Sequence, residues 1–152
     1  MSITIDGKEL EFTPGQTVYE VAKANGIYIP VLCHHEQLKP VGACRVCVVE
    51  VEKARSLIAS CAMPADNGMV VYTNTERVLQ ARKLAVELLM TQGHHNCITC
   101  ENSGNCVLQD LAYSLGIETP RFDEPVEVKA FEQANEMIVT EMNKCVLCGL
   151  CV

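Results

Sequence analysis

Ten cysteines fall into three groups along this 152-residue chain, and their spacing points to metal chemistry. The first group has the spacing C-x10-C-x2-C-x13-C, and Gly42 and Ala43 precede its close pair: Cys33, Cys44, Cys47 and Cys61. Four thiolates complete the ligand set of a [2Fe–2S] cluster, whose sulfurs accept hydrogen bonds from backbone N–H groups that approach closely. Zinc is the alternative, but zinc ribbons normally have two close cysteine pairs and this group has one.

The second group supplies three thiolates in the spacing C-x2-C-x5-C: Cys97, Cys100 and Cys106. Three thiolates leave a [4Fe–4S] cluster one ligand short. His94 and His95 lie three and two residues before the first of these cysteines, and Gly93, four residues before it, has no side chain to bind with. From the residues alone, either histidine could complete the set, or both could be ordinary loop residues beside an external fourth ligand.

The third group, Cys145, Cys148 and Cys151, is spaced C-x2-C-x2-C, like the first three ligands of the bacterial ferredoxin run. The sequence stops at Val152 with no unassigned cysteine left, so we expect these residues to be the head of a longer polypeptide in which this partial [4Fe–4S] site is completed. His34 and His35 are expected to be loop residues, because the first group already has four thiolates.

The composition narrows the class of protein. A net charge of −7 argues against a nucleic-acid binder, which needs clustered Lys and Arg. No run approaches the ~20 apolar residues of a membrane span, and the first residues do not resemble a signal peptide. Ten cysteines in such a chain favour ligation in the reducing cytoplasm over a disulfide-linked scaffold. With 5% aromatics and no Trp, the core must be small and aliphatic, so bound inorganic centres are expected to help hold the fold.

The patterning predicts an α+β protein. A hairpin is expected over 2–12 around Asp6-Gly7, then a short helix from a Thr17/Glu20 capping box, and strands at 46–51, 57–58 and 69–72. This order outlines a β-grasp that ends near residue 73.

A long helix is expected to follow from a Thr73/Glu76 capping box to about residue 90. Its predicted inner stripe is Val78, Leu79, Ala85, Val86, Leu88 and Leu89, and its predicted outer residues are Arg77, Arg82, Lys83 and Glu87. A second helix is expected over 106–115. The predicted domains are a β-grasp at 1–73, a small helical domain at 74–116, a linker at 117–140 and the start of a two-cluster ferredoxin domain at 141–152.

The stretch LCHHEQLKPVGACRVCVVEVE, with ASCAMP ending the loop, resembles the [2Fe–2S] domain at the head of [FeFe]-hydrogenases. Similar domains head the iron–sulfur subunit of complex I (NADH:quinone oxidoreductase), the diaphorase iron–sulfur subunit of soluble NAD-linked hydrogenases and some NAD-linked formate dehydrogenases. The x10 and x13 gaps differ from the C-x4-C-x2-C spacing of plant-type ferredoxins. The resemblance covers essentially the whole chain.

In these families the second cysteine group carries a [4Fe–4S] cluster with one histidine ligand, most often as H-x3-C-x2-C-x5-C. This sequence departs from that form at Gly93. Relatives of the diaphorase type have a shorter form, H-x-C, which His95 and Cys97 resemble in their spacing. This resemblance favours His95 over His94 as the ligand. A neutral imidazole in place of a thiolate removes one negative charge, so we expect a less reducing centre than an all-cysteine one.

The resemblance implies an electron-transfer module of a multisubunit NAD(P)-linked oxidoreductase, with no catalytic residue in this stretch. The residues around the first group favour an [FeFe]-hydrogenase, including the electron-bifurcating kind. The implied partners are a flavin subunit that carries FMN and oxidises NAD(P)H, a thioredoxin-like [2Fe–2S] subunit and a terminal redox site. The alternatives are a formate dehydrogenase or complex I subunit and, from another class, a zinc-stabilised interaction module.

Overall fold

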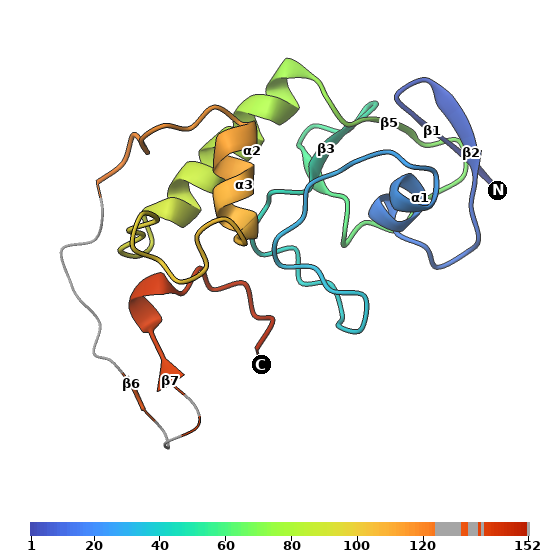
Figure 1. The fold of residues 1–152 in the computed structure, drawn as a ribbon. Coiled ribbons are helices and arrows are strands. Elements are labelled where there is room, and N and C mark those ends of the chain that lie inside the picture. The colour runs from blue at the N-terminus through green and yellow to red at the C-terminus, as the bar shows by residue number, and fades with distance from the viewer. Residues whose placement is uncertain (124–131, 134–136, 138, 152) are drawn as a thin grey trace. The chain divides into compact units, whose positions relative to one another are not determined.

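The computed structural model of the chain describes residues 1–123, 132–133, 137 and 139–151, which divide into two compact units (Figure 1). The first unit comprises residues 1–82 and 149–152, and the second comprises residues 83–148. The unit boundary falls within one long helix, so each unit takes part of it.

A five-stranded mixed sheet, in the order β2-β1-β5-β3-β4, forms the first unit. Strand β1 (Ser2–Ile5) pairs antiparallel with β2 (Lys8–Glu11) and parallel with β5 (Val70–Tyr72). Strand β3 (Val48–Val51) pairs antiparallel with both β5 and β4 (Ile58–Ala59). The predicted strands are therefore present, although β3 begins two residues later than expected, after the last cysteine of the close pair.

Two local signals of the sequence are confirmed at the start of the chain. Asp6 and Gly7 both have positive φ, 50° and 79°, as a tight turn between β1 and β2 requires. Helix α1 (Val18–Ala24) begins at the predicted capping box: the Thr17 side chain accepts the Glu20 N–H at 3.2 Å, and the Glu20 carboxylate accepts the Thr17 N–H at 2.7 Å.

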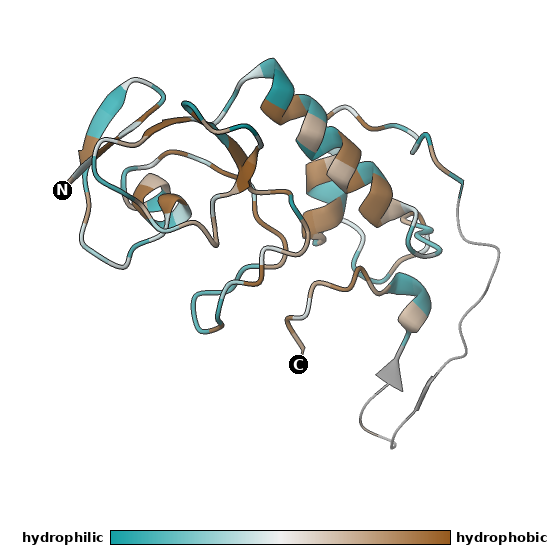
Figure 2. Cartoon of the chain, turned by 180° about the vertical axis from the view of Figure 1, so that it is seen from behind, coloured by the Kyte–Doolittle hydropathy of each residue, from teal (hydrophilic) through white to brown (hydrophobic). Residues whose placement is uncertain are grey.

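The hydrophobic core of the first unit lies between the sheet and α1. Its strand residues include Ile3, Ile5, Val49 and Val71, and its helix residues are Val18, Val21 and Ala22. Edge strand β2 is hydrophilic by contrast (Figure 2). Two cysteines of the first group, Cys47 and Cys61, belong to this core and are each 1% exposed. The predicted site is therefore built into the packing of the sheet.

Helix α2 (Glu76–Met90) does not begin with the predicted Thr73/Glu76 capping box. The Thr73 N–H and hydroxyl both donate to the Asp6 carboxylate, at 2.7 and 2.5 Å. Thr75 instead accepts the Val78 N–H on its side-chain oxygen at 3.3 Å. The prediction was wrong because Asp6, distant in sequence, takes the hydroxyl that the box needs.

The predicted faces of α2 are also partly wrong. In the first unit, Arg82 is only 4% exposed whereas Leu79 is 39% exposed. The Arg82 guanidinium donates to the Val48 carbonyl at 2.9 Å, which ties the helix to β3.

In the second unit, Glu87 is 1% exposed whereas Leu88 is 44% exposed. The Glu87 carboxylate accepts hydrogen bonds from Arg121 on both oxygens, at 3.0 Å each from Nε. These hydrogen bonds hold the pKa of Glu87 below its usual value. Partners distant in sequence thus override the amphipathic pattern at both buried charges.

Helix α3 (Val107–Ser114) lies where the second helix was predicted, begins directly after Cys106, and buries Leu108, Leu111 and Ala112. Strand β6 (Glu132–Gln133) pairs with β7 (Val139–Thr140), and a 3-10 helix spans Met142–Lys144. Half of the predicted linker at 117–140 lies outside the described residues. In its described first part, Ile117 is buried and Arg121 bonds to Glu87.

Candidate metal centres

All four cysteines of the first group are buried in the first unit, and each is 1–7% exposed. Cys33 and Cys44 lie on the loop between α1 and β3, Cys47 ends that loop, and Cys61 follows β4. The structure thus brings the four predicted thiols to one loop region at the edge of the core.

Two contacts join the four cysteines in pairs, one between two thiols and one from a backbone N–H to a thiol. The sulfurs of Cys47 and Cys61 lie 3.3 Å apart, and the Cys44 N–H points at the Cys33 sulfur at an N-to-S distance of 3.5 Å. In the described part of the chain, no three His, Cys, Asp or Glu side chains converge closely enough to hold a single metal ion. Two pairs of thiols suit a two-iron cluster, in which each iron takes two protein ligands.

Left-handed backbone shapes the loop around the close pair. Gly42 has φ 67° and Arg45, between Cys44 and Cys47, has φ 58°. A Cβ at position 42 would lie 3.5 Å from the Cβ atoms of Ala59 and Ala62, which is an ordinary contact. The positive φ by itself accounts for a glycine at this position. Close approach of the Gly42 backbone to a cluster stays a prediction.

Electrostatics couples the thiols of the first group. The hydrogen bond between Cys47 and Cys61 lowers the pKa of Cys47 and raises the pKa of Cys61, so the pair favours holding one shared proton. Burial raises the pKa of Cys44. Full deprotonation of such a set requires a strong positive charge among the sulfurs, and bound metal ions supply one.

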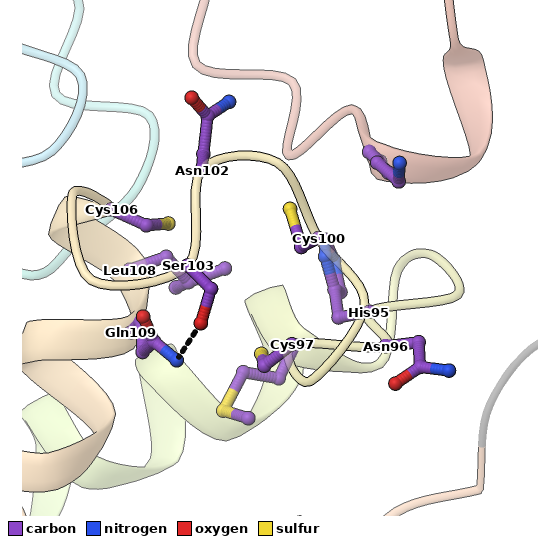
Figure 3. A pocket seen from close by; sticks show the side chains of 11 residues that line it. His95, Asn96, Cys97, Cys100, Asn102, Ser103, Cys106, Leu108 and Gln109 are labelled. Carbon is purple, nitrogen blue, oxygen red and sulfur yellow. Dashed lines mark hydrogen bonds between the residues drawn. The ribbon is translucent and has the colours of Figure 1, made fainter.

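A cavity in the second unit brings together the residues predicted for the second centre (Figure 3). His95, Cys97, Cys100 and Cys106 line it, together with other residues of the loop between α2 and α3. The three cysteines are half-buried. One imidazole and three thiols around one cavity suit the ligand set of a [4Fe–4S] cluster.

His94 is not among the residues that line this cavity. Its backbone N–H donates to the Asn143 carbonyl at 2.9 Å. A Cβ at Gly93 would lie 1.9 Å from the same carbonyl oxygen, so no larger residue fits there without movement of the backbone. No pattern in the sequence indicates this contact, because Asn143 lies far along the chain.

The sequence did not indicate the other residues of this cavity, among them Met90, at the end of α2, and Lys144, at the end of the 3-10 helix. The position of Lys144 directly before Cys145 was the available signal. Its ammonium pairs with Glu141 at 2.8 Å.

The third cysteine group is divided between the units. Cys145 and Cys148 are half-buried in the second unit, and Cys151 is an exposed residue of the segment 149–152. Leu147 and Gly149, on either side of Cys148, have positive φ, 52° and 73°. Convergence of this group on one centre stays a prediction.

Comparison with known families decides what the chain is related to. Residues 1–76, half of the chain, match the model of the 2Fe-2S iron-sulfur cluster binding domain. The chain belongs to this family. Residues 82–121 match a second model, the NADH-ubiquinone oxidoreductase-G iron-sulfur binding region. The presence of both a 2Fe–2S and a 4Fe–4S binding region in an α+β protein is therefore confirmed.

Relatives of this 2Fe–2S domain protein come from two kinds of NAD-linked enzyme. A protein of the NADH-quinone oxidoreductase of Rickettsia bellii is 41% identical over the whole chain and 22% of that protein. The gamma chain of the NAD-reducing hydrogenase HoxS of Cupriavidus necator is 38% identical over the whole chain and 64% of that protein. The chain spans about a fifth of the length of the first of these relatives.

A solved structure of an NAD+-reducing [NiFe]-hydrogenase in the H2-reduced state has a chain that is 40% identical to this one. The match has a TM-score of 0.93 and covers 99% of this chain and 64% of the other. The predicted resemblance to the iron–sulfur region shared by complex I and NAD-linked hydrogenases is confirmed. Within the described residues, no helix has the length and the apolar run needed to cross a bilayer.

Proposed function

We propose that this chain is the electron-transfer iron–sulfur module of a multisubunit NAD(P)-linked oxidoreductase whose terminal site is a hydrogenase. The observation that carries the proposal is the arrangement of the cysteines: two buried thiol pairs in one unit and a cavity lined by one histidine and three cysteines in the other. Each set lies within residues matched by an iron–sulfur family.

The proposed ligands of the [2Fe–2S] centre are Cys33, Cys44, Cys47 and Cys61. Those of the [4Fe–4S] centre are His95, Cys97, Cys100 and Cys106, and Cys145, Cys148 and Cys151 would supply part of a third site. His95 is preferred over His94 because it lines the cavity with the three cysteines. Bound there, iron–sulfur clusters would supply one-electron transfer and no bond-making chemistry.

The protein's part in this function is to hold ligands, exclude water and set potentials. The first set of thiols is shielded by the core of the sheet, and low solvent exposure is one of the factors that set the potential of such a centre. No nucleophile or general base is assigned in this stretch.

The first domain is proposed to be a β-grasp, on the support of its mixed sheet with α1 packed in the core. The proposed boundaries are residues 1–73, 74–116, 117–140 and 141–152. The first family match ends at residue 76 and the second begins at residue 82, which supports a division near the start of α2.

The proposed location is the cytoplasm. Its reducing conditions would keep ten cysteines as free thiols that can bind metal.

The hydrogenase proposal draws on the relative from the NAD-reducing hydrogenase and on the [NiFe]-hydrogenase structure. These relatives do not favour the [FeFe] type over the [NiFe] type. The proposed partners are a flavin subunit that carries FMN and oxidises NAD(P)H, and a thioredoxin-like [2Fe–2S] subunit. A second candidate is the iron–sulfur subunit of complex I, which the relative in Rickettsia bellii supports.

The test is anaerobic iron and acid-labile sulfide determination, with EPR of the reduced protein. We expect about six irons per chain and two EPR signals of different relaxation rates, from one [2Fe–2S] and one [4Fe–4S] centre. Zinc without sulfide would contradict the electron-transfer proposal and favour an interaction module. Hydrogen-dependent reduction of NAD by the assembled complex would separate the hydrogenase from complex I.

A further inference from the structure

Arg82 is a buried cation with no acidic partner among the described residues. Arg82 is 4% exposed, and its guanidinium donates a hydrogen bond to the neutral carbonyl of Val48 at 2.9 Å. Its Nε is buried and has no hydrogen-bond partner in the described part of the chain. An unpaired buried charge is costly, so such a group needs a compensating anion nearby.

The carbonyl that accepts the Arg82 hydrogen bond lies next to a cysteine of the first group. Val48 directly follows Cys47, whose sulfur belongs to the close pair with Cys61. Burial lowers the pKa of Arg82, and the nearby charge of a Cys47 thiolate opposes that effect more than Tyr28 or Asp6 does. The guanidinium therefore lies within electrostatic reach of Cys47, one of the proposed ligands.

We propose that Arg82 is the counter-charge of the first centre and raises its reduction potential. The inference rests on the proposed function. A cluster held by four thiolates is negatively charged and gains one more negative charge when it accepts one electron from a redox partner, while no bond forms or breaks. A fixed cation beside it stabilises the reduced form more than the oxidised form.

The chain offers a matched control on the same helix and in the same unit. Arg77 is also an arginine of α2, but its side chain is 51% exposed and pairs with Glu50 at 3.2 Å. Solvent screens such a charge far more than a buried one.

The experiment is a redox titration of the whole chain, followed through the EPR signal of the [2Fe–2S] centre, in wild type and in Arg82→Gln and Arg77→Gln variants. Glutamine keeps an N–H donor for the Val48 carbonyl and removes the charge. We expect Arg82→Gln to lower the reduction equilibrium constant on the order of tenfold, about 59 mV for one electron, and Arg77→Gln to leave it unchanged. If Arg82→Gln does not fold, Arg82→Met is expected to give the same shift.

Arg82→Lys separates charge from hydrogen bonding. We expect it to keep a potential near that of wild type, because the positive charge remains. A fall equal to that of Arg82→Gln would overturn the proposal, and so would an iron-loaded Arg82→Gln protein with an unchanged potential. Absence of iron and sulfide from the wild type would instead overturn the proposed function, so the two failures are distinguishable.

Discussion

The two cysteine sites differ in what surrounds them. The thiols of the first site are almost fully buried, and two of them are part of the hydrophobic core of the sheet. The thiols of the second site are half-buried on the loop between α2 and α3 and face a cavity. The first site is thus built into a hydrophobic core, whereas the second lies on a loop that lines a cavity.

This difference predicts how each centre is coupled to folding. Removal of a ligand from the first site leaves unfilled volume and coupled thiols inside a core, where both are costly. The cysteines of the second loop are half-buried and line a cavity, so we expect removal of one of them to disturb less core packing. Metal binding should therefore stabilise the first unit globally and the second one locally.

The largest expected effect comes from Cys47→Ser. We expect loss of the two irons of the first centre and destabilisation of the first unit on the order of 3 kcal/mol, because core packing and cluster binding fail together. Iron determination and hydrogen–deuterium exchange in β1 and β5 measure the two effects.

Cys100→Ser is the matched variant in the second site. It should lose about four irons and leave exchange in β1 and β5 nearly unchanged. Equal loss of protection in the first unit from both variants would contradict the contrast between the two sites.

A medium effect is expected from Gly93→Ala. The added methyl group would meet the Asn143 carbonyl at 1.9 Å, so the hydrogen bond from the His94 N–H to that carbonyl must break or stretch. We expect a local cost of about 1–3 kcal/mol and reduced iron loading of the second centre only. The control is Thr99→Ala, at an exposed position in the same loop, which should leave iron loading unchanged. Iron loading at the wild-type level in Gly93→Ala would contradict the prediction.

Local signals in the sequence predicted the parts of the fold that depend on adjacent residues. The turn at Asp6-Gly7 and the Thr17/Glu20 capping box need only residues within one turn of each other, and both are present. The short spacing of Cys97, Cys100 and Cys106 was informative in the same way, because the chain itself holds these three residues near one cavity. Their role as ligands stays a prediction.

The features that the sequence did not predict depend on contacts between residues far apart in the chain. Arg82 and Glu87 are buried on α2 because Val48 and Arg121, each 34 residues away, supply their hydrogen bonds. A hydrophobic pattern assigns both charges to solvent, since it contains no information on such partners. The need for a glycine at Gly93 has the same origin.

The smallest expected effect, a change in potential without loss of iron, tests the histidine ligand proposed for the second site. His95→Cys should lower the potential of the [4Fe–4S] centre on the order of 100 mV, because a charged thiolate replaces a neutral imidazole. His94→Ala should leave it unchanged, since the backbone N–H that binds Asn143 remains. Redox titration followed by EPR measures both, and a shift in the His94 variant with none in the His95 variant would exchange their roles.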